Sequence, residues 1–153
     1  MMGRTHMVFG LLAGLLFFSV FNQKWYYFIP TAILGSLLPD IDHENSKINK
    51  MVPVTRWVPK FFQHRGVFHS IFPILLIYFG FRSANLNIVG IPLAIGYASH
   101  LFSDSMTKMG LNLLHPVSTV RVQGFIDTGG VKEYIVLGVV GCLSVLVFFK
   151  QFF

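Results

Sequence analysis

Five apolar segments divide the chain, and most of them are shorter than a full membrane span. They cover residues 6–21, 25–39, 67–81, 86–103 and 131–149. A helix needs about 20 apolar residues to cross the hydrocarbon core of a bilayer. The fifth segment is therefore the cleanest candidate, and the others reach that length only if their polar ends are helical too. The pattern predicts an all-α bundle of about five helices that forms a single domain over residues 1–153.

The connections between these segments differ in length and polarity. Residues 22–24 and 82–87 are short enough for hairpin turns, whereas residues 40–66 and 104–130 are long and hold most of the polar side chains. The second long connection ends in VSTVRVQGFIDTGG. This stretch predicts either a small β-like excursion or a surface loop.

Composition places the helices in a membrane. Hydrophobic residues make up 54% of the chain and charged residues only 12%, and there are 17 Phe residues. Ordinary soluble domains are about a quarter charged, so too few polar side chains remain to cover a soluble fold. The single cysteine, Cys142, is expected to be a small buried apolar group. In the first segment, Gly10 and Gly14 have the G-x-x-x-G spacing that lets another helix approach closely.

The distribution of Lys and Arg predicts the orientation in the membrane. With five spans, the N-terminus and both long connections share one face, which carries nine of the basic residues, and the opposite face carries three. Lys and Arg favour the cytoplasmic side, so we expect a multi-pass membrane protein with the N-terminus inside and the C-terminus outside. Because the excess positive charge lies in the loops, we interpret it as a topology signal and a contact with anionic lipid, not as a nucleic-acid site.

Imidazoles and carboxylates gather at four of the predicted helix ends. They are His6 at the start of the first segment, Asp40 and Asp42 at the end of the second, His64 and His69 at the start of the third, and His100 and Asp104 at the end of the fourth. Since successive helices alternate in direction, all of these ends are predicted to lie on the cytoplasmic face. The opposite ends are almost free of such groups.

This set of side chains predicts a metal site. His100 and Asp104 are four residues apart, which places both on one stripe of a helix, although Asp104 also fits a helix cap and Asp40 a turn. Mixed histidine and carboxylate ligation suits zinc, manganese or iron, and the lack of thiolate ligands argues against structural zinc. We expect one or two divalent ions per chain, most simply zinc. The candidate ligands are His6, Asp40, Asp42, His43, His69, His100 and Asp104, of which His43 is equally well explained as a loop residue.

A metal site of this kind predicts hydrolysis. The cations would lower the pKa of a bound water, and the hydroxide would attack an electrophilic centre such as phosphorus. The candidate catalytic residues are Asp42, His64, Arg65 and Glu133. Arg65 either clamps a phosphate oxygen or is one more cytoplasmic charge, and Glu133 either complements the dipole of the fifth helix or acts as an outer ligand or general base. Ser70 and Thr107 suit hydrogen bonds that orient the ligands.

Four pieces of the chain resemble a known family. They are THMVFG (5–10), GSLLPDIDHENS (35–46), HRGVFHS (64–70) and GYASHLFSDSMTKMGLNLLHP (96–116). In order and spacing they are similar to the LexA-regulated inner-membrane metal-dependent hydrolases of bacteria and archaea, and TGGVKEYIV (128–136) fits less specifically. The resemblance implies that the family's functional positions fall on His6, Asp40, Asp42, His69, His100 and Asp104, with His43, His64 and Arg65 beside them.

That family is distantly similar to zinc-dependent phospholipase C, which implies a phospholipid or another phosphoester as substrate and membrane lipid as partner. The chain lacks both the N-terminal Trp that supplies a ligand there and a second clear His-x-x-x-Glu pair, so two metals are the upper expectation. Two other functions stay open. A metal-ion or proton transporter would need a polar path through the outer half, for which Ser19, Thr31 and Ser144 are the main candidates. A non-catalytic scaffold would use the metal only to fasten helix ends together.

Overall fold

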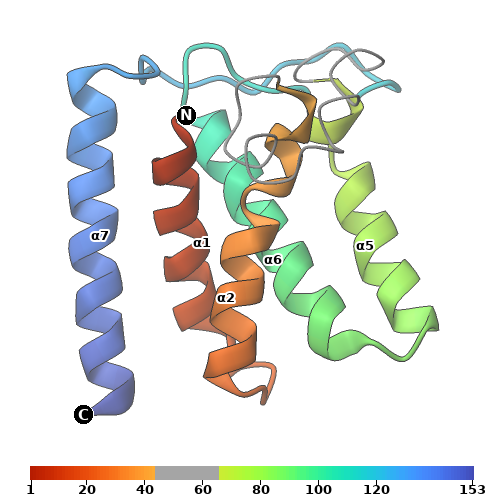
Figure 1. Cartoon of the computed structure of the whole chain (residues 1–153). Helices are drawn as coiled ribbons and strands as arrows, with labels where there is room; N and C mark the ends of the chain where they lie inside the picture. Colours follow the sequence, from red (N-terminus) through yellow and green to blue (C-terminus); the bar gives the residue numbers. More distant parts are fainter. Residues whose placement is uncertain (44–65) are drawn as a thin grey trace.

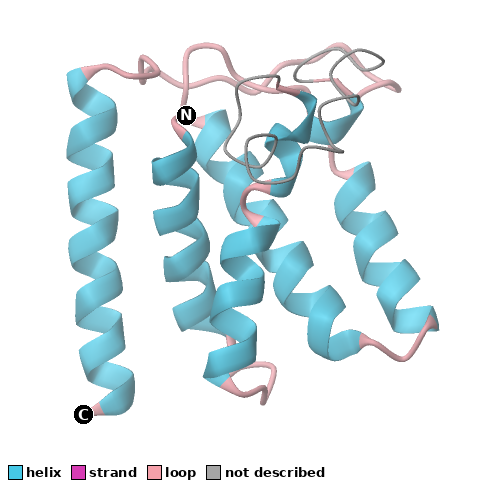
Figure 2. Cartoon of the chain, viewed as in Figure 1, coloured by secondary structure: helices cyan, strands magenta, loops and turns pink. Residues whose placement is uncertain are grey.

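The computed structural model describes residues 1–43 and 66–153, and within these ranges the chain is all-helical. The helices are α1 (Gly3–Phe17), α2 (Trp25–Gly35), α5 (Phe72–Ser83), α6 (Asn87–Ser105) and α7 (Val131–Phe152), with short 3-10 turns at η1 (Leu38–Asp42) and η3 (Val67–His69). The described part holds five α-helices and no strand, as Figure 2 shows, which confirms the predicted all-α class.

Two of the observed α-helices are shorter than the apolar segments that predicted them, because part of each segment forms a 3-10 turn. The second segment leaves the α-helix at Gly35 and continues as the 3-10 turn η1, and the third begins with the 3-10 turn η3 before α5 starts. Both 3-10 turns carry predicted ligands. The connection from α6 to α7 is a loop with two isolated bridges, between Thr107 and Ile126 and between Leu111 and Val122.

By length and composition, only α7 among the described helices is apolar and long enough to cross a membrane. Its 22 residues span about 33 Å at 1.5 Å per residue. α1 and α5 are shorter apolar helices. α7 presents most of its side chains outward, and Cys142 on this helix is exposed, so the expectation that it is buried is wrong.

The core of the bundle is formed by α1, α2 and α6, which pack against one another, while α5 packs on α6 and α7 lies beside α1 (Figure 1). Small residues permit the close approach of α2 to its neighbours. A Cβ atom at Gly96 would lie 1.9 Å from the carbonyl oxygen of Ala32, and one at Gly10 would lie 2.5 Å from Ser36 Oγ. The G-x-x-x-G spacing of α1 therefore allows the close approach of α2.

Helix direction brings distant parts of the sequence to one end of the bundle. The start of α1, the end of α2, the start of α5 and the end of α6 all lie at the end where the N-terminus is marked in Figure 1. The start of α7 lies at this end too, and the C-terminus lies at the opposite end. The predicted ligands thus have a common location in the fold.

Candidate metal centre

A cluster of buried imidazole and carboxylate groups occupies this end of the bundle. It comprises His6 from α1, Asp40 and Asp42 from η1, His69 from η3, and His100 and Asp104 from α6. The side chains of these residues are 0–2% exposed except that of Asp40, which is 17% exposed. Buried ionisable groups are costly unless they are paired or bind a cation. The predicted convergence of these six residues is confirmed by their mutual distances.

Two imidazole nitrogens lie at the centre of the cluster, with a carboxylate oxygen from each of two aspartates near them. His69 Nε2 and His100 Nε2 are 3.3 Å apart. Asp104 Oδ2 lies 3.7 Å from the first of these nitrogens and 3.9 Å from the second, and Asp40 Oδ1 lies 4.0 Å and 3.8 Å from the same atoms. In a tetrahedral zinc site, bonds of about 2.0–2.2 Å place neighbouring donors roughly 3.3–3.6 Å apart. The two nitrogens are thus spaced as ligands of a single cation, and each carboxylate oxygen lies a few tenths of an ångström further from them than a ligand of the same ion would.

Hydrogen bonds fix the orientation of both central imidazoles. His100 Nδ1 lies 2.8 Å from the carbonyl oxygen of Ser36, which can only accept, so this nitrogen donates and carries the hydrogen. His69 Nδ1 lies 3.2 Å from Asp42 Oδ2 and donates to that carboxylate in the same way. In the neutral ring, each Nε2 then directs its lone pair into the cluster. Carboxylate and carbonyl partners of this type orient metal-ligating histidines and make them more basic.

The second oxygen of Asp104 faces a different neighbour. Asp104 Oδ1 lies 3.4 Å from His6 Nε2 and pairs with the amino group of Met1. The His6 ring stacks on that of His100 with 3.7 Å between the centroids, and His6 Nδ1 lies 2.8 Å from Ser103 Oγ. His6, His100 and Asp104 form a second group that could hold a cation, next to the group of Asp40, His69 and His100. Asp104 could therefore bridge two adjacent positions.

Two of the remaining predicted site residues, His43 and Glu133, belong to neither candidate cation group among the described residues. His43 is exposed at the end of η1. Glu133 is buried in the first turn of α7, where its carboxylate accepts from the Met2 N–H at 2.6 Å, Thr5 Oγ1 at 2.7 Å and the Gly129 N–H at 2.7 Å. Its contacts thus join the start of α1 to the start of α7. His64 and Arg65 fall outside the described residues.

The hydroxyl groups around the cluster are not all the expected ones. Ser70 Oγ donates to the backbone carbonyl of Val67, and Thr107 Oγ1 donates to the backbone carbonyl of Asp104. Both hydroxyls therefore bond the backbone and not the ligand side chains. The ligand side chains are oriented instead by the Ser36 carbonyl and by Ser103. Ser103 follows His100 by three residues, a helical spacing that could have identified it, whereas no sequence signal marks the carbonyl of Ser36.

The fold and this cluster together define the class of the protein, which is a small helical membrane protein with buried histidine and carboxylate groups at one end. The chain belongs to the YdjM inner membrane protein family, whose profile matches residues 1–150. Membrane localisation and the membrane part of the resemblance drawn from the sequence are thereby confirmed.

Two relatives illustrate the range of the family. The chain is 33% identical to the uncharacterized protein YvsG of Bacillus subtilis over 99% of its own length and 97% of that protein. It is 32% identical to the inner membrane protein YdjM of Escherichia coli over 60% of its own length, and this match spans half of that relative. No solved structure matches the chain significantly.

Proposed function

We propose that this protein is an integral-membrane, metal-dependent hydrolase that acts on a phospholipid or another lipid-linked phosphoester. The observation that carries the proposal is the 3.3 Å separation of His69 Nε2 and His100 Nε2, whose lone pairs face each other when both rings are neutral and carry the hydrogen on Nδ1. Two such lone pairs repel unless a proton or a cation lies between them. With the oxygens of Asp40 and Asp104 beside them, the donor set is the mixed nitrogen and oxygen set that suits zinc, with manganese and iron as alternatives.

Each residue of the cluster has a distinct part in this proposal. His69, His100, Asp40 and Asp104 hold the cation, and Asp42 acts through His69 by fixing its ring, so it is a positioning residue and not a direct ligand. A bound divalent cation supplies Lewis acidity and lowers the pKa of a coordinated water. His6 and the second oxygen of Asp104 offer a place for a second ion. Asp40 is the one partly exposed member of the six residues, so a substrate would approach from its side.

The proposal includes the arrangement in the bilayer. All five described α-helices cross as one domain of residues 1–153, with the N-terminus and the metal site on the cytoplasmic side and the C-terminus outside. α1 and α5, at 15 and 12 residues, extend about 22 Å and 18 Å. Their shortness is compatible with crossing because a bilayer thins around short helices at a modest cost. Exposed Leu76 and Phe79 on α5 and Leu146 on α7 give these helices lipid-compatible outer faces.

Metal analysis with a matched variant tests the proposal. Purified protein should contain about one zinc, manganese or iron ion per chain, and this content should disappear in the double variant His100→Ala with Asp104→Ala. The control is His115→Ala, because His115 belongs to neither candidate cation group. A panel of phospholipid and phosphoester substrates should be turned over by the wild type and by His115→Ala only. A folded wild type without metal would contradict the proposal.

A structural metal is the second candidate function. The six residues of the cluster come from α1, η1, η3 and α6, so a cation would cross-link four elements. The same experiment separates the two functions, because a scaffold would contain the metal without turnover. The transporter hypothesis gains no such support, since the hydroxyls of Thr31 and Ser144 donate to carbonyls of their own helices, at Tyr27 and Val140.

A further inference from the structure

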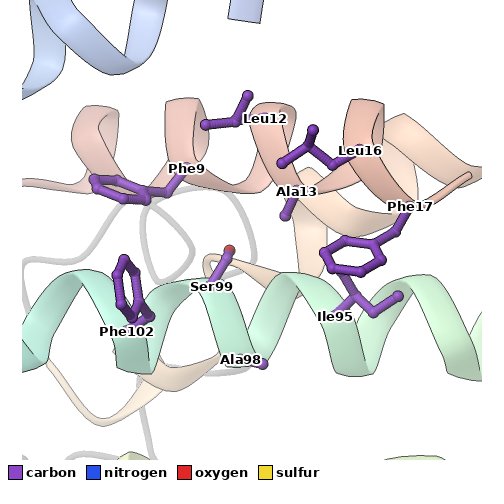
Figure 3. Close-up of a pocket in the computed structure, with 9 residues that line it drawn as sticks. All are labelled: Phe9, Leu12, Ala13, Leu16, Phe17, Ile95, Ala98, Ser99 and Phe102. Carbon is purple, nitrogen blue, oxygen red and sulfur yellow. The ribbon is translucent and has the colours of Figure 1, made fainter. Parts of the chain in front are cut away.

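The helix α6 has two faces that differ in chemistry where it passes the His–Asp cluster. One face lines an apolar groove of about 430 Å³ against α1, and Figure 3 shows its residues Ile95, Ala98, Ser99 and Phe102. At 100° per residue, the opposite face carries a stripe of buried side chains, which are Tyr97, His100, Leu101 and Asp104. His100 and Asp104 belong to the candidate metal centre. Tyr97 is the remaining polar residue of this stripe.

Tyr97 holds the backbone of the 3-10 turn that presents His69. The Tyr97 side chain is buried, and its hydroxyl donates at 2.5 Å to the carbonyl of Phe68, the residue before His69. On the other side of His69, the Ile71 N–H donates to the carbonyl of Leu113 at 2.9 Å. Leu113 lies in the loop after α6 and packs against the apolar cluster that contains Tyr97. The turn η3 is thus fixed on both sides of His69 by α6 and the loop that follows it.

These two bonds also determine where the 3-10 turn ends. Within η3, two bonds of the i to i+3 type end at the N–H groups of His69 and Ser70. The next bond of this pattern would join the Ile71 N–H to the Phe68 carbonyl. Both groups bond elsewhere instead, and the backbone of Ser70 is extended. The Tyr97 hydroxyl therefore takes the place of the N–H group that would continue the turn.

We propose that Tyr97 is a positioning residue for His69 in the candidate metal centre. This inference rests on the proposed function and adds a residue to its site. Tyr97 and His100 are three residues apart on α6, so one helix both fixes the backbone at His69 and carries the imidazole that faces it. This arrangement sets the 3.3 Å separation of His69 Nε2 and His100 Nε2. Without the hydroxyl, the Ile71 N–H returns to the Phe68 carbonyl, and the longer turn rotates His69 away from His100.

Zinc binding by full-length Tyr97→Phe tests this inference, with competition against a chelator as the measurement. We expect about tenfold weaker binding than in the wild type, since outer residues that orient metal ligands contribute about 10- to 100-fold. Ser99→Ala is the first control, because it removes a hydroxyl from the groove face of α6. Leu101→Val is the second, because it removes a methylene from the apolar cluster that Leu101 shares with Tyr97. Both controls should bind zinc as the wild type does.

A second measurement separates positioning from packing. Nitrogen-15 NMR of the histidine rings in the metal-free protein reports which ring nitrogen carries the hydrogen. Tyr97→Phe should change this signal for His69, because a loosened η3 loosens the bond from His69 to Asp42, while His100 keeps its hydrogen on Nδ1 against the Ser36 carbonyl. The Leu101→Val variant should keep the wild-type signals of both rings. An unchanged His69 signal with wild-type zinc affinity in Tyr97→Phe, or equal losses of zinc affinity in Tyr97→Phe and Leu101→Val, would overturn the inference.

The failure of this inference is distinguishable from that of the proposed function. If the wild type contains metal and turns over phosphoesters while Tyr97→Phe behaves as Ser99→Ala does, only the positioning role of Tyr97 is wrong. If the wild type binds no metal, the proposed function is wrong. The ring signal of His69 in Tyr97→Phe then still decides whether Tyr97 positions His69, because that measurement uses the metal-free protein.

Discussion

Asp42 Oδ2 lies 3.2 Å from His69 Nδ1, and both side chains are fully buried. This contact joins the 3-10 turn η1 to the 3-10 turn η3 and determines which nitrogen of His69 faces His100. A carboxylate in this position acts on a metal site through the histidine it holds. In the proposed metal site, Asp42 of the PDIDH stretch would therefore act without touching the ion.

We predict that Asp42→Asn weakens metal binding about 10- to 100-fold without abolishing it, because the ring of His69 loses its charged partner. Competition against a zinc chelator measures this affinity. Asp127→Asn is the control, since Asp127 is exposed and pairs with Lys108 at 2.8 Å. Complete loss of the metal in Asp42→Asn would instead identify Asp42 as a direct ligand.

Glu133 is predicted to stabilise the fold and not the metal. Its carboxylate accepts three hydrogen bonds, of which those from the Met2 N–H and Thr5 Oγ1 join α1 to α7, and a neutral amide accepts on one oxygen only. Glu133→Gln should therefore lower the free energy of unfolding by about 2 kcal/mol while the metal content stays at the wild-type level. Thermal unfolding and metal analysis on the same preparation check both parts. A loss of metal at unchanged stability would restore the ligand or general-base role.

Gly96→Ala should disturb the metal site from a distance. The added methyl group would overlap the carbonyl oxygen of Ala32 and push α2 from α6, which lengthens the bond from His100 Nδ1 to the Ser36 carbonyl. Overpacking of this kind costs about 1–3 kcal/mol. Gly138→Ala on α7 is the matched control, because its Cβ would meet nothing within 4 Å. We expect lower thermal stability and weaker metal binding for Gly96→Ala only, and equal behaviour of the two variants would contradict the packing argument.

The proposed topology predicts opposite accessibility at the two ends of the bundle. In a Cys142→Ser background, Lys24→Cys lies between α1 and α2 and Lys108→Cys follows α6. A membrane-impermeant maleimide should label the first in right-side-out vesicles and the second in inside-out vesicles. Labelling of both positions from the same side would rule out the proposed crossings.

The helices and the clustering of imidazole and carboxylate groups at one end were predictable from the sequence, because both depend on the order of residues along the chain. Apolar runs long enough for helices define the elements, and alternation of direction places the ends that carry His6, His69 and His100 together. The identity of the metal and the reaction stay predictions, since the types of ligand narrow these choices without deciding them.

The tertiary structure alone decided how the individual atoms meet. Whether Asp42 contacts a histidine, whether Glu133 joins two helices and whether His43 lies outside the cluster depend on helix rotation and on distances between helices. Those are determined by contacts between residues far apart in the sequence, such as Gly96 against Ala32. The hydrogen-bond partner of His100 Nδ1 is a backbone carbonyl. Every residue has one, so the residue types in the sequence could not have predicted this contact. The hydrophobic pattern depends on residues that are neighbours along the chain. It therefore predicts the helices, but not the distances and rotations between them.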